Sequence, residues 1–281
     1  VREFEGIWML TSDQVESYKE DGFLVIDDLF DQSELQILYD DFNSVVDHWA
    51  NVYYEQGRLF NLFKDDPFEY RLFSIHQALK GNCHELLSAV SGKRKTAAMF
   101  HVMMLPQILN VVESIIGSEI LVHPQFNARA KLPDSKSVVP WHQDLGYLHK
   151  NAENTFMVNF WLPLVDATVE NGCLEIIRGS HNYGIVPYKN GAEDLVSESI
   201  PDGEIVCCPI RVGSVLMIQH KTVHRSTPNF SDHIRWSLDI RYSDPRLPTG
   251  RDSVPGFIAR SVENPELVAK SHRDWLNLFE L

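Results

Sequence analysis

The pattern of apolar and polar positions divides the chain into a helix-rich first part and a strand-rich second part. Helices are predicted over 10–21, 32–49 and 105–116, where apolar side chains recur at intervals of three and four residues. The first of these begins with capping residues and is followed by Gly22, a residue typical of a helix end. A short apolar strand is predicted over 23–26, between the first two helices.

An aromatic-rich stretch, residues 52–75, is predicted to be irregular. Its side chains, with that of Trp49, either form a lid or pocket wall, or fill the core, and the core is the commoner outcome for such residues. The aromatic residues concerned are Trp49, Tyr53, Tyr54, Phe60, Phe63, Phe68 and Tyr70.

From residue 120 onward the chain shows short apolar runs separated by turn residues, a texture typical of a sandwich or barrel. The predicted strands are 120–131, 156–165, 173–178, 204–209, 214–219 and 234–242. We therefore expect a mainly β fold with a helical N-terminal layer on a double-stranded β-helix core, of jelly-roll, cupin-like type. The chain is predicted to be one domain, with a helical layer over 1–119, a β-helix core over 120–245 and a C-terminal extension over 246–281.

The predicted strand 234–242 alternates strictly between apolar and polar residues, so its two faces differ in character. The polar face is either exposed to solvent or, in a barrel, lines an active-site cavity. The apolar face carries Ile234, Trp236, Leu238, Ile240 and Tyr242, and the polar face carries Arg235, Ser237, Asp239 and Arg241.

The net charge of the chain bears on which kinds of molecule it can bind. The net charge is −14, with 39 acidic residues against 25 basic ones, which argues against nucleic acid as a partner. The four cysteines form no C-x-x-C pair and are predicted to be free thiols in a reducing, intracellular (cytoplasmic) compartment. We see no signal peptide and no apolar run near the roughly 20 residues that span a bilayer, so no membrane association is expected. The expected partner is a small-molecule substrate, and the expected state is a monomer or homodimer.

Candidate metal ligands are found at His142, Asp144 and His224. In an extended strand, residues i and i+2 share a face, so His142 and Asp144 are expected to converge on one point. Such a pair is a weak signal alone, and a remote histidine would complete a 2-His-1-carboxylate set. That set leaves coordination positions open and is typical of non-haem Fe(II) oxygenases. His224 is the predicted third ligand, with His220 a rival that we expect to have a structural or supporting role.

A cation and a hydroxyl follow the third candidate ligand. Arg235 lies on the polar face of strand 234–242, and its planar guanidinium is suited to pair with the distal carboxylate of 2-oxoglutarate. Ser226 is expected to donate a further hydrogen bond to the same carboxylate. The sequence therefore predicts a co-substrate site beside the metal.

At this point the sequence resembles the phytanoyl-CoA dioxygenase family of 2-oxoglutarate oxygenases, over about residues 10–245. The segments that carry the resemblance occur in the family's order. They are Asp21-Gly22-Phe23-Leu24-Val25-Ile26, Leu105-Pro106-Gln107-Ile108-Leu109, Trp141-His142-Gln143-Asp144-Leu145, Glu170-Asn171-Gly172-Cys173-Leu174-Glu175, Arg178-Gly179-Ser180-His181, and Val223-His224-Arg225-Ser226 with Arg235.

The resemblance implies a dioxygenase that uses Fe(II), 2-oxoglutarate and O2, hydroxylates an unactivated C–H bond and releases succinate and CO2. It places the iron on His142, Asp144 and His224. It places the co-substrate on Arg235, Ser226, Trp161 and Gln125. The candidates for contact with the primary substrate are Asn127, Lys131, Tyr147 and His149.

Two further comparisons, one a departure from the common family pattern and one a contrast with related halogenases, concern residues beside the metal. Arg225 stands where glycine is usual, and we expect it to point to solvent or to reach a substrate anion. Asp144 is present where related halogenases have a small residue, which favours hydroxylation over halogenation. The segments around Asn171-Gly172 and Gly179-Ser180 are predicted to shape the fold rather than to perform chemistry.

Three alternatives stay open at this point. The same scaffold also supports desaturation, cyclisation or epoxidation. A cupin-like metal enzyme would use no 2-oxoglutarate, and a binding protein on the same scaffold would have no activity.

Overall fold

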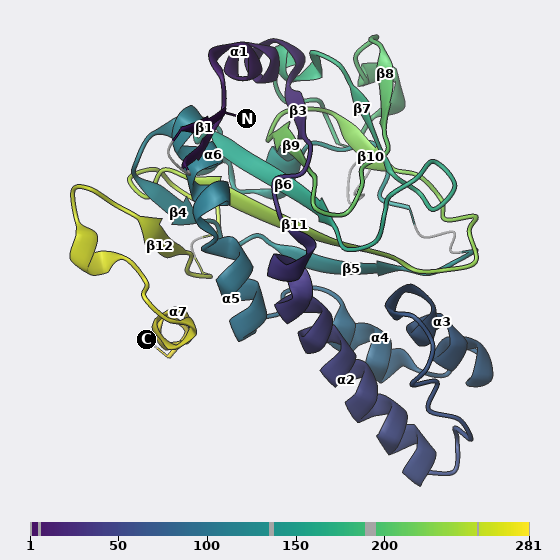
Figure 1. Cartoon of the computed structure of the whole chain (residues 1–281). Helices are drawn as coiled ribbons and strands as arrows, with labels where there is room; N and C mark the ends of the chain where they lie inside the picture. The colour runs from purple at the N-terminus through teal and green to yellow at the C-terminus, as the bar shows by residue number, and fades with distance from the viewer. Residues whose placement is uncertain (1, 5–6, 135–137, 189–194, 252, 281) are drawn as a thin grey trace.

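The computed structural model describes residues 2–4, 7–134, 138–188, 195–251 and 253–280, and combines helices with antiparallel sheets (Figure 1). The α-helices are α1 Ser12–Asp21, α2 Gln36–Glu55, α3 Phe68–Ala78, α4 His84–Val90, α5 Ala97–Met103, α6 Pro106–Ile116 and α7 His272–Asn277. The strands are β1 Arg2–Phe4, β2 Ile7–Met9, β3 Phe23–Ile26, β4 Ile120–Val122, β5 Asn127–Lys131, β6 Met157–Pro163, β7 Leu174–Ile177, β8 Ile205–Cys208, β9 Val215–Gln219, β10 His224–Ser226, β11 Arg235–Ser243 and β12 Phe257–Arg260.

The predicted start and end of the first helix are confirmed. Thr11 caps α1 through a capping box with Gln14, and Gly22 ends the helix in the left-handed conformation at φ 83°. The second predicted helix is split into a 3-10 turn, Gln32–Leu35, followed by α2.

The prediction of an irregular stretch over 52–75 is wrong at both ends. Helix α2 continues to Glu55 because its buried face repeats through Val46, Ala50 and Tyr53, and α3 begins at Phe68. Of the seven aromatic residues in and near this stretch, none is among the residues that line the two cavities described below. Tyr53 is buried in the core, whereas Phe60 is 87% exposed.

Two antiparallel sheets dominate the second part of the chain. The larger has seven strands in the order β12-β4-β11-β6-β9-β3, with β5 also paired to β11, and the smaller has the order β10-β7-β8. The predicted strand 120–131 is two strands, since β4 pairs with the end of β11 while β5 pairs with its beginning. Strands β10 and β12 were not predicted, and the latter brings the C-terminal extension into the large sheet.

The alternation in β11 fixes which face of the large sheet carries the site. Its apolar residues belong to the main core, where Trp236 stacks on Phe68 of α3 with ring centroids 4.9 Å apart. The helices α2 to α5 lie on this side, and the small sheet lies on the other (Figure 1). Arg235, Ser237 and Arg241 are nevertheless buried. The polar face therefore lines an interior space, as the cavity alternative predicted.

A second apolar cluster lies between the two sheets. It joins Trp161 of β6 and Ile218 of β9 to Leu174 and Ile176 of β7. This packing holds the small sheet against the polar face of β11. The space left between the sheets is the setting of the site.

Among the described residues, no single helix has the length and apolar character needed to cross a membrane. Helices α5 and α6 reach that length only when taken together, and they meet at an angle of 47°.

Candidate active site

Three side chains that could bind a metal converge between the sheets. One ligand atom from each of His142, Asp144 and His224 can be chosen so that all three lie within 4.8 Å of one another, and all three residues are buried. The two imidazole rings have their centroids 4.1 Å apart. Residues predicted to meet from positions far apart in the chain therefore do meet.

The local backbone differs from the predicted strand. His142 and His224 form an isolated antiparallel bridge, in which each backbone N–H donates to the other residue's carbonyl at 3.0 Å. Asp144 begins a 3-10 helix that runs to Tyr147. The expectation that 142–144 would form an extended strand is wrong, because the chain turns directly after the bridge. The three side chains still converge.

The hydrogen bonds of the two imidazoles orient their Nε2 atoms towards the cluster. Nδ1 of His142 lies 2.8 Å from the carbonyl of Pro140, and Nδ1 of His224 lies 2.9 Å from the carbonyl of Thr222. A carbonyl only accepts, so each Nδ1 carries the proton and each Nε2 keeps its lone pair. Burial, together with the neighbouring His224, lowers the pKa of His142 to about 3. His142 is therefore neutral, as a metal ligand must be.

The carboxylate of Asp144 is held by two donors that the sequence did not single out as site residues. Arg241 donates from Nη2 to Oδ1 at 2.5 Å, and Asn159 donates from Nδ2 to Oδ2 at 2.5 Å. Burial opposes ionisation of Asp144, but Arg241, the largest of the opposing causes, outweighs it and holds its pKa well below the usual range. Asp144 is thus ionised beside two imidazoles, a donor set that fits Fe(II).

A buried glutamine fixes the turn between the first two candidate ligands. Gln143 donates from Nε2 to the carbonyls of Gly184 and Lys221 at 2.7 and 2.6 Å, and its Oε1 accepts from the N–H of Val186 at 2.8 Å. The Tyr188 hydroxyl also bonds to the backbone of Gln143. These bonds prevent the turn from rotating, and so they fix the directions in which His142 and Asp144 point.

His220, the rival ligand, lies outside the three-residue cluster. Its Nδ1 accepts from the backbone N–H of Met157 at 3.2 Å, and its ring meets the edge of Phe156. Its carbonyl accepts from the N–H of Leu145, beside Asp144. These contacts fit the supporting role expected of it.

A cavity opens beside the cluster. It is walled by both sheets, and its polar lining includes Asn159, Ser226, Arg235 and Arg241. A second cavity shares Arg129, Val139, Ser226 and Arg235 with the first. Arg129 was not predicted; it lines both cavities and pairs with Asp239 at 2.6 Å.

Arg235 is almost completely buried, at 2% exposure, and it lines both cavities. Its Nη1 donates to the carbonyl of Gly172 at 2.7 Å, and its guanidinium lies over the ring of Trp161, 5.1 Å from the centroid. Burial lowers the pKa of Arg235 to about 10, which still leaves it charged at neutral pH. A buried guanidinium without a carboxylate partner among the described residues is suited to bind an anionic ligand.

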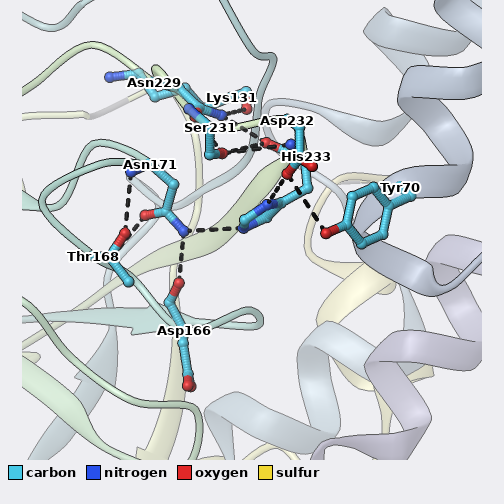
Figure 2. Close-up of polar contacts among 9 residues, drawn as sticks. All are labelled: Tyr70, Lys131, Asp166, Thr168, Asn171, Asn229, Ser231, Asp232 and His233. Carbon is cyan, nitrogen blue, oxygen red and sulfur yellow. Dashed lines mark hydrogen bonds and ion pairs between the residues drawn. The ribbon is translucent and has the colours of Figure 1, made fainter.

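The turn that carries Gly172 is fastened by Asn171, as Figure 2 shows. The Asn171 side chain accepts from the N–H of Thr168 at 2.7 Å and donates to the carbonyl of Asp166 at 2.7 Å. On its other side it lies 3.4 Å from Nε2 of His233, in the segment that leads into β11. These contacts support the structural role predicted for this segment, and they place the carbonyl that holds Arg235.

The remaining predicted residues are distributed unevenly around the cavities. Gln125 is buried, and its carbonyl accepts from Arg241 at 2.9 Å. Asn127 and Lys131 line the second cavity. The Tyr147 ring lies 5.5 Å from that of His142, whereas His149 is exposed and lines neither cavity.

Arg225 is partly exposed to solvent, and it lines neither of the two cavities. Its Nε donates to Glu175 at 2.7 Å, and its guanidinium lies 4.5 Å from the centre of the Trp141 ring. The side chain is 40% exposed and is anchored on the outer side of the small sheet.

Comparison with known proteins agrees with this geometry. The family model of phytanoyl-CoA dioxygenase matches residues 18–237. The rat phytanoyl-CoA dioxygenase domain-containing protein 1 is 33% identical over 139 residues, which are 46% of this chain and 47% of that protein, so the chain spans about half the length of this relative. The ectoine dioxygenase of Bordetella bronchiseptica is 25% identical over 253 residues, 83% of this chain and 75% of that protein.

A solved structure shows the same fold. EctD from S. alaskensis, determined with 2-oxoglutarate and 5-hydroxyectoine, superposes with a TM-score of 0.59 at 17% identity, covering 85% of this chain and 77% of that one.

Proposed function

The chain belongs to the phytanoyl-CoA dioxygenase family, and we propose that it is a non-haem Fe(II)- and 2-oxoglutarate-dependent dioxygenase. The specific reaction we propose is hydroxylation of an unactivated C–H bond in a small molecule, with release of succinate and CO2. The observation that carries this proposal is the convergence of two imidazoles and one carboxylate at a cavity that is also lined by Arg235.

Different residues are proposed to bind the metal and the co-substrate. Nε2 of His142, Nε2 of His224 and the Asp144 carboxylate would hold Fe(II) on one side and leave its other side open to the cavity. When bound, the metal and the keto acid supply the oxidising power, through oxidative decarboxylation of the keto acid by O2. The chain contributes orientation and the exclusion of water.

Arg235 is the proposed anchor of the co-substrate's distal carboxylate. Its guanidinium is fixed by Gly172 and Trp161, so it can offer its remaining N–H groups without reorganising. Ser226 and Trp161 line the same cavity. Gln125 stays a proposed contact, since its Oε1 is buried without a hydrogen-bond partner among the described residues.

The finer description of the fold is also part of this proposal. Two antiparallel sheets with a buried site between them are the arrangement expected of a double-stranded β-helix, or jelly roll. The division into an N-terminal layer, a core and a C-terminal extension remains a prediction. So do the intracellular location and the monomeric or homodimeric state.

The presence of Asp144 supports hydroxylation over halogenation, because its carboxylate fills the position that a halide would need. Desaturation, cyclisation and epoxidation begin with the same removal of hydrogen from substrate, and product analysis separates them. Tyr147, whose ring lies 5.5 Å from that of His142, and Asn127, which lines the second cavity, are the proposed substrate contacts.

Anaerobic titration of the metal-free protein with Fe(II) and 2-oxoglutarate tests the proposal. A weak metal-to-keto-acid charge-transfer band should appear towards the red end of the visible spectrum, and His142→Ala and Asp144→Ala should each abolish it. A cupin-like enzyme that needs no 2-oxoglutarate would keep its turnover in Arg235→Ala. Absence of the band, and of succinate release with every substrate class tried, would instead favour a binding protein.

A further inference from the structure

Lys131 and Arg235 form a pair of buried cations on neighbouring strands. The two residues are directly opposite in the antiparallel register of β5 and β11, so their side chains leave the sheet on the same face. Both are buried, Lys131 at 8% and Arg235 at 2% exposure. Like charges in this arrangement repel one another strongly, because little water is present to screen them.

The two carboxylates that line the first cavity are already engaged. Asp239 is ion-paired with Arg129 at 2.6 Å, and Asp144 with Arg241 at 2.5 Å. Lys131 instead donates to the Ser226 hydroxyl at 3.1 Å and to the carbonyl of Thr227. Within the described part of the chain, neither cation of the pair has an acidic partner.

The electrostatic cost of the arrangement is visible at Lys131. The pKa of Lys131 is lowered to about 7, mainly by burial and further by the charges of Arg235 and Arg129. Lys131 is therefore only partly protonated near neutral pH, whereas Arg235 keeps its charge. An anion lying between the two side chains would remove the repulsion and supply the missing partner.

The cavities show where such an anion would lie. Lys131, Arg235 and Ser226 together line the second cavity, and Arg235 and Ser226 also line the cavity beside the metal ligands. A ligand bound at the metal that reaches Arg235 therefore ends beside Lys131.

Building on the proposed function, we propose that Lys131 is the second cation of the 2-oxoglutarate site and binds the distal carboxylate together with Arg235 and Ser226. Lys131 is then a co-substrate contact rather than the primary-substrate contact predicted from the sequence. Two cations around one carboxylate select keto acids that carry a second negative charge. Keto acids with an uncharged tail are discriminated against by both residues.

The test combines a change in the protein with a change in the ligand. Dissociation constants are measured anaerobically with Fe(II), for 2-oxoglutarate and for 2-oxopentanoate, in which a methyl group replaces the distal carboxylate. Lys131→Met should weaken 2-oxoglutarate about 10- to 100-fold, the range expected for a lost charge-assisted hydrogen bond. The same variant should leave the affinity for 2-oxopentanoate within about twofold of wild type, because that ligand has no charge for Lys131 to bind.

The controls separate this role from a structural one. Lys131→Arg keeps a cation and should retain most of the affinity for 2-oxoglutarate, and Lys150→Met, which removes an exposed lysine, should retain all of it. Lys131→Gln, checked for folding by circular dichroism, serves as the second variant if Lys131→Met does not fold.

Two outcomes would overturn the inference while leaving the proposed function intact. They are an equal loss of affinity for both keto acids, and an unchanged affinity for 2-oxoglutarate in a folded variant. Failure of the wild-type protein to bind either keto acid would remove the proposed function, and this inference with it.

Discussion

Arg241 and Asp144 form a buried ion pair in which Nη2 of the arginine lies 2.5 Å from Oδ1 of the carboxylate. Asn159 holds Oδ2 at the same distance, so both oxygens of the proposed ligand accept a hydrogen bond from the protein. The carboxylate is therefore fixed in one orientation before any metal binds. We expect this fixation to favour binding of the metal through a single oxygen, which leaves more of the coordination sphere open to ligands.

Replacing Arg241 by methionine should weaken metal binding. The substitution removes the donor that orients Asp144, and outer-shell changes of this kind typically cost about 10- to 100-fold in metal affinity. Titration of the metal-free protein with Mn(II), followed by electron paramagnetic resonance, measures the effect. Arg246→Met is the matched control, because Arg246 is exposed and pairs with Asp244 away from the site. Wild-type affinity in a folded Arg241→Met protein would contradict the role given to this pair.

Replacing Arg235 should affect the co-substrate and leave the metal alone. Arg235→Lys keeps the charge but loses the planar fork, and we expect the dissociation constant for 2-oxoglutarate to rise about tenfold. Arg235→Met should raise it by about 100-fold, since a charged hydrogen-bonding group is lost. The affinity for Mn(II) without keto acid provides the internal control and should stay at the wild-type value. A parallel fall in both affinities would show a general disturbance of the site.

Gly172→Ala should destabilise the fold and weaken the co-substrate site together. Gly172 has φ of 90°, and an added Cβ would lie 2.5 Å from the carbonyl oxygen of Thr227. The left-handed backbone and the clash together should lower the free energy of unfolding by about 2 kcal/mol or more. Displacement of the Gly172 carbonyl should also release Arg235. Urea denaturation and the keto-acid titration measure the two effects.

Gly57→Ala is the control for this substitution, since Gly57 also has a positive φ, of 67°, but nothing lies within 4 Å of its added Cβ. It should cost about 1 kcal/mol for the backbone conformation alone. Equal losses in the two variants would argue against the contact with Thr227.

Stability of the metal-free protein should fall in mild acid. Burial lowers the pKa of both His123 and His220 to about 4, from an ordinary value of 6.5. Below pH 6.5 the unfolded chain therefore binds protons that the folded protein does not, and stability is lost as the pH falls from about 6.5 towards 4. Between pH 7.5 and 5.5 each histidine should cost about 1 kcal/mol.

Urea midpoints measured at several pH values test this expectation. His123→Gln removes one of three histidines whose pKa is lowered, since that of His142 falls to about 3, and it should flatten the profile by about a third, whatever it does to stability at pH 7.5. An unchanged slope in His123→Gln would assign the acid sensitivity to other groups.

The pair His142 and Asp144, and the position of Arg235, were predictable because each depends on a pattern within a short stretch of sequence. His142 and Asp144 are two residues apart, and Arg235 lies in a strand whose alternation is complete. The same alternation put Arg241 on the polar face of that strand. It did not reveal which residue Arg241 would meet, because Asp144 lies almost 100 positions away in the chain.

Other features left no usable pattern. Asn159 lies in β6, where all seven residues are buried, so there was no alternation to show which side chains face the cavity. The break between β4 and β5 arises because the two strands pair with different parts of β11. The pattern of apolar and polar residues does not indicate which strands pair. His149 follows Asp144 closely in sequence, but it lies beyond the 3-10 helix Asp144–Tyr147, where its side chain is exposed and lines neither cavity. Proximity along the chain was a poor guide there.

The reciprocal backbone hydrogen bonds between His142 and His224 have a consequence for biosynthesis. A ribosome-bound chain that ends before residue 224 contains two of the proposed ligands, but it lacks both the third and the backbone partner that positions the first. Iron can therefore be captured only after most of the polypeptide has been made and the small sheet has closed. Until then the chain offers only two of the three ligands, and so the complete site forms late in synthesis.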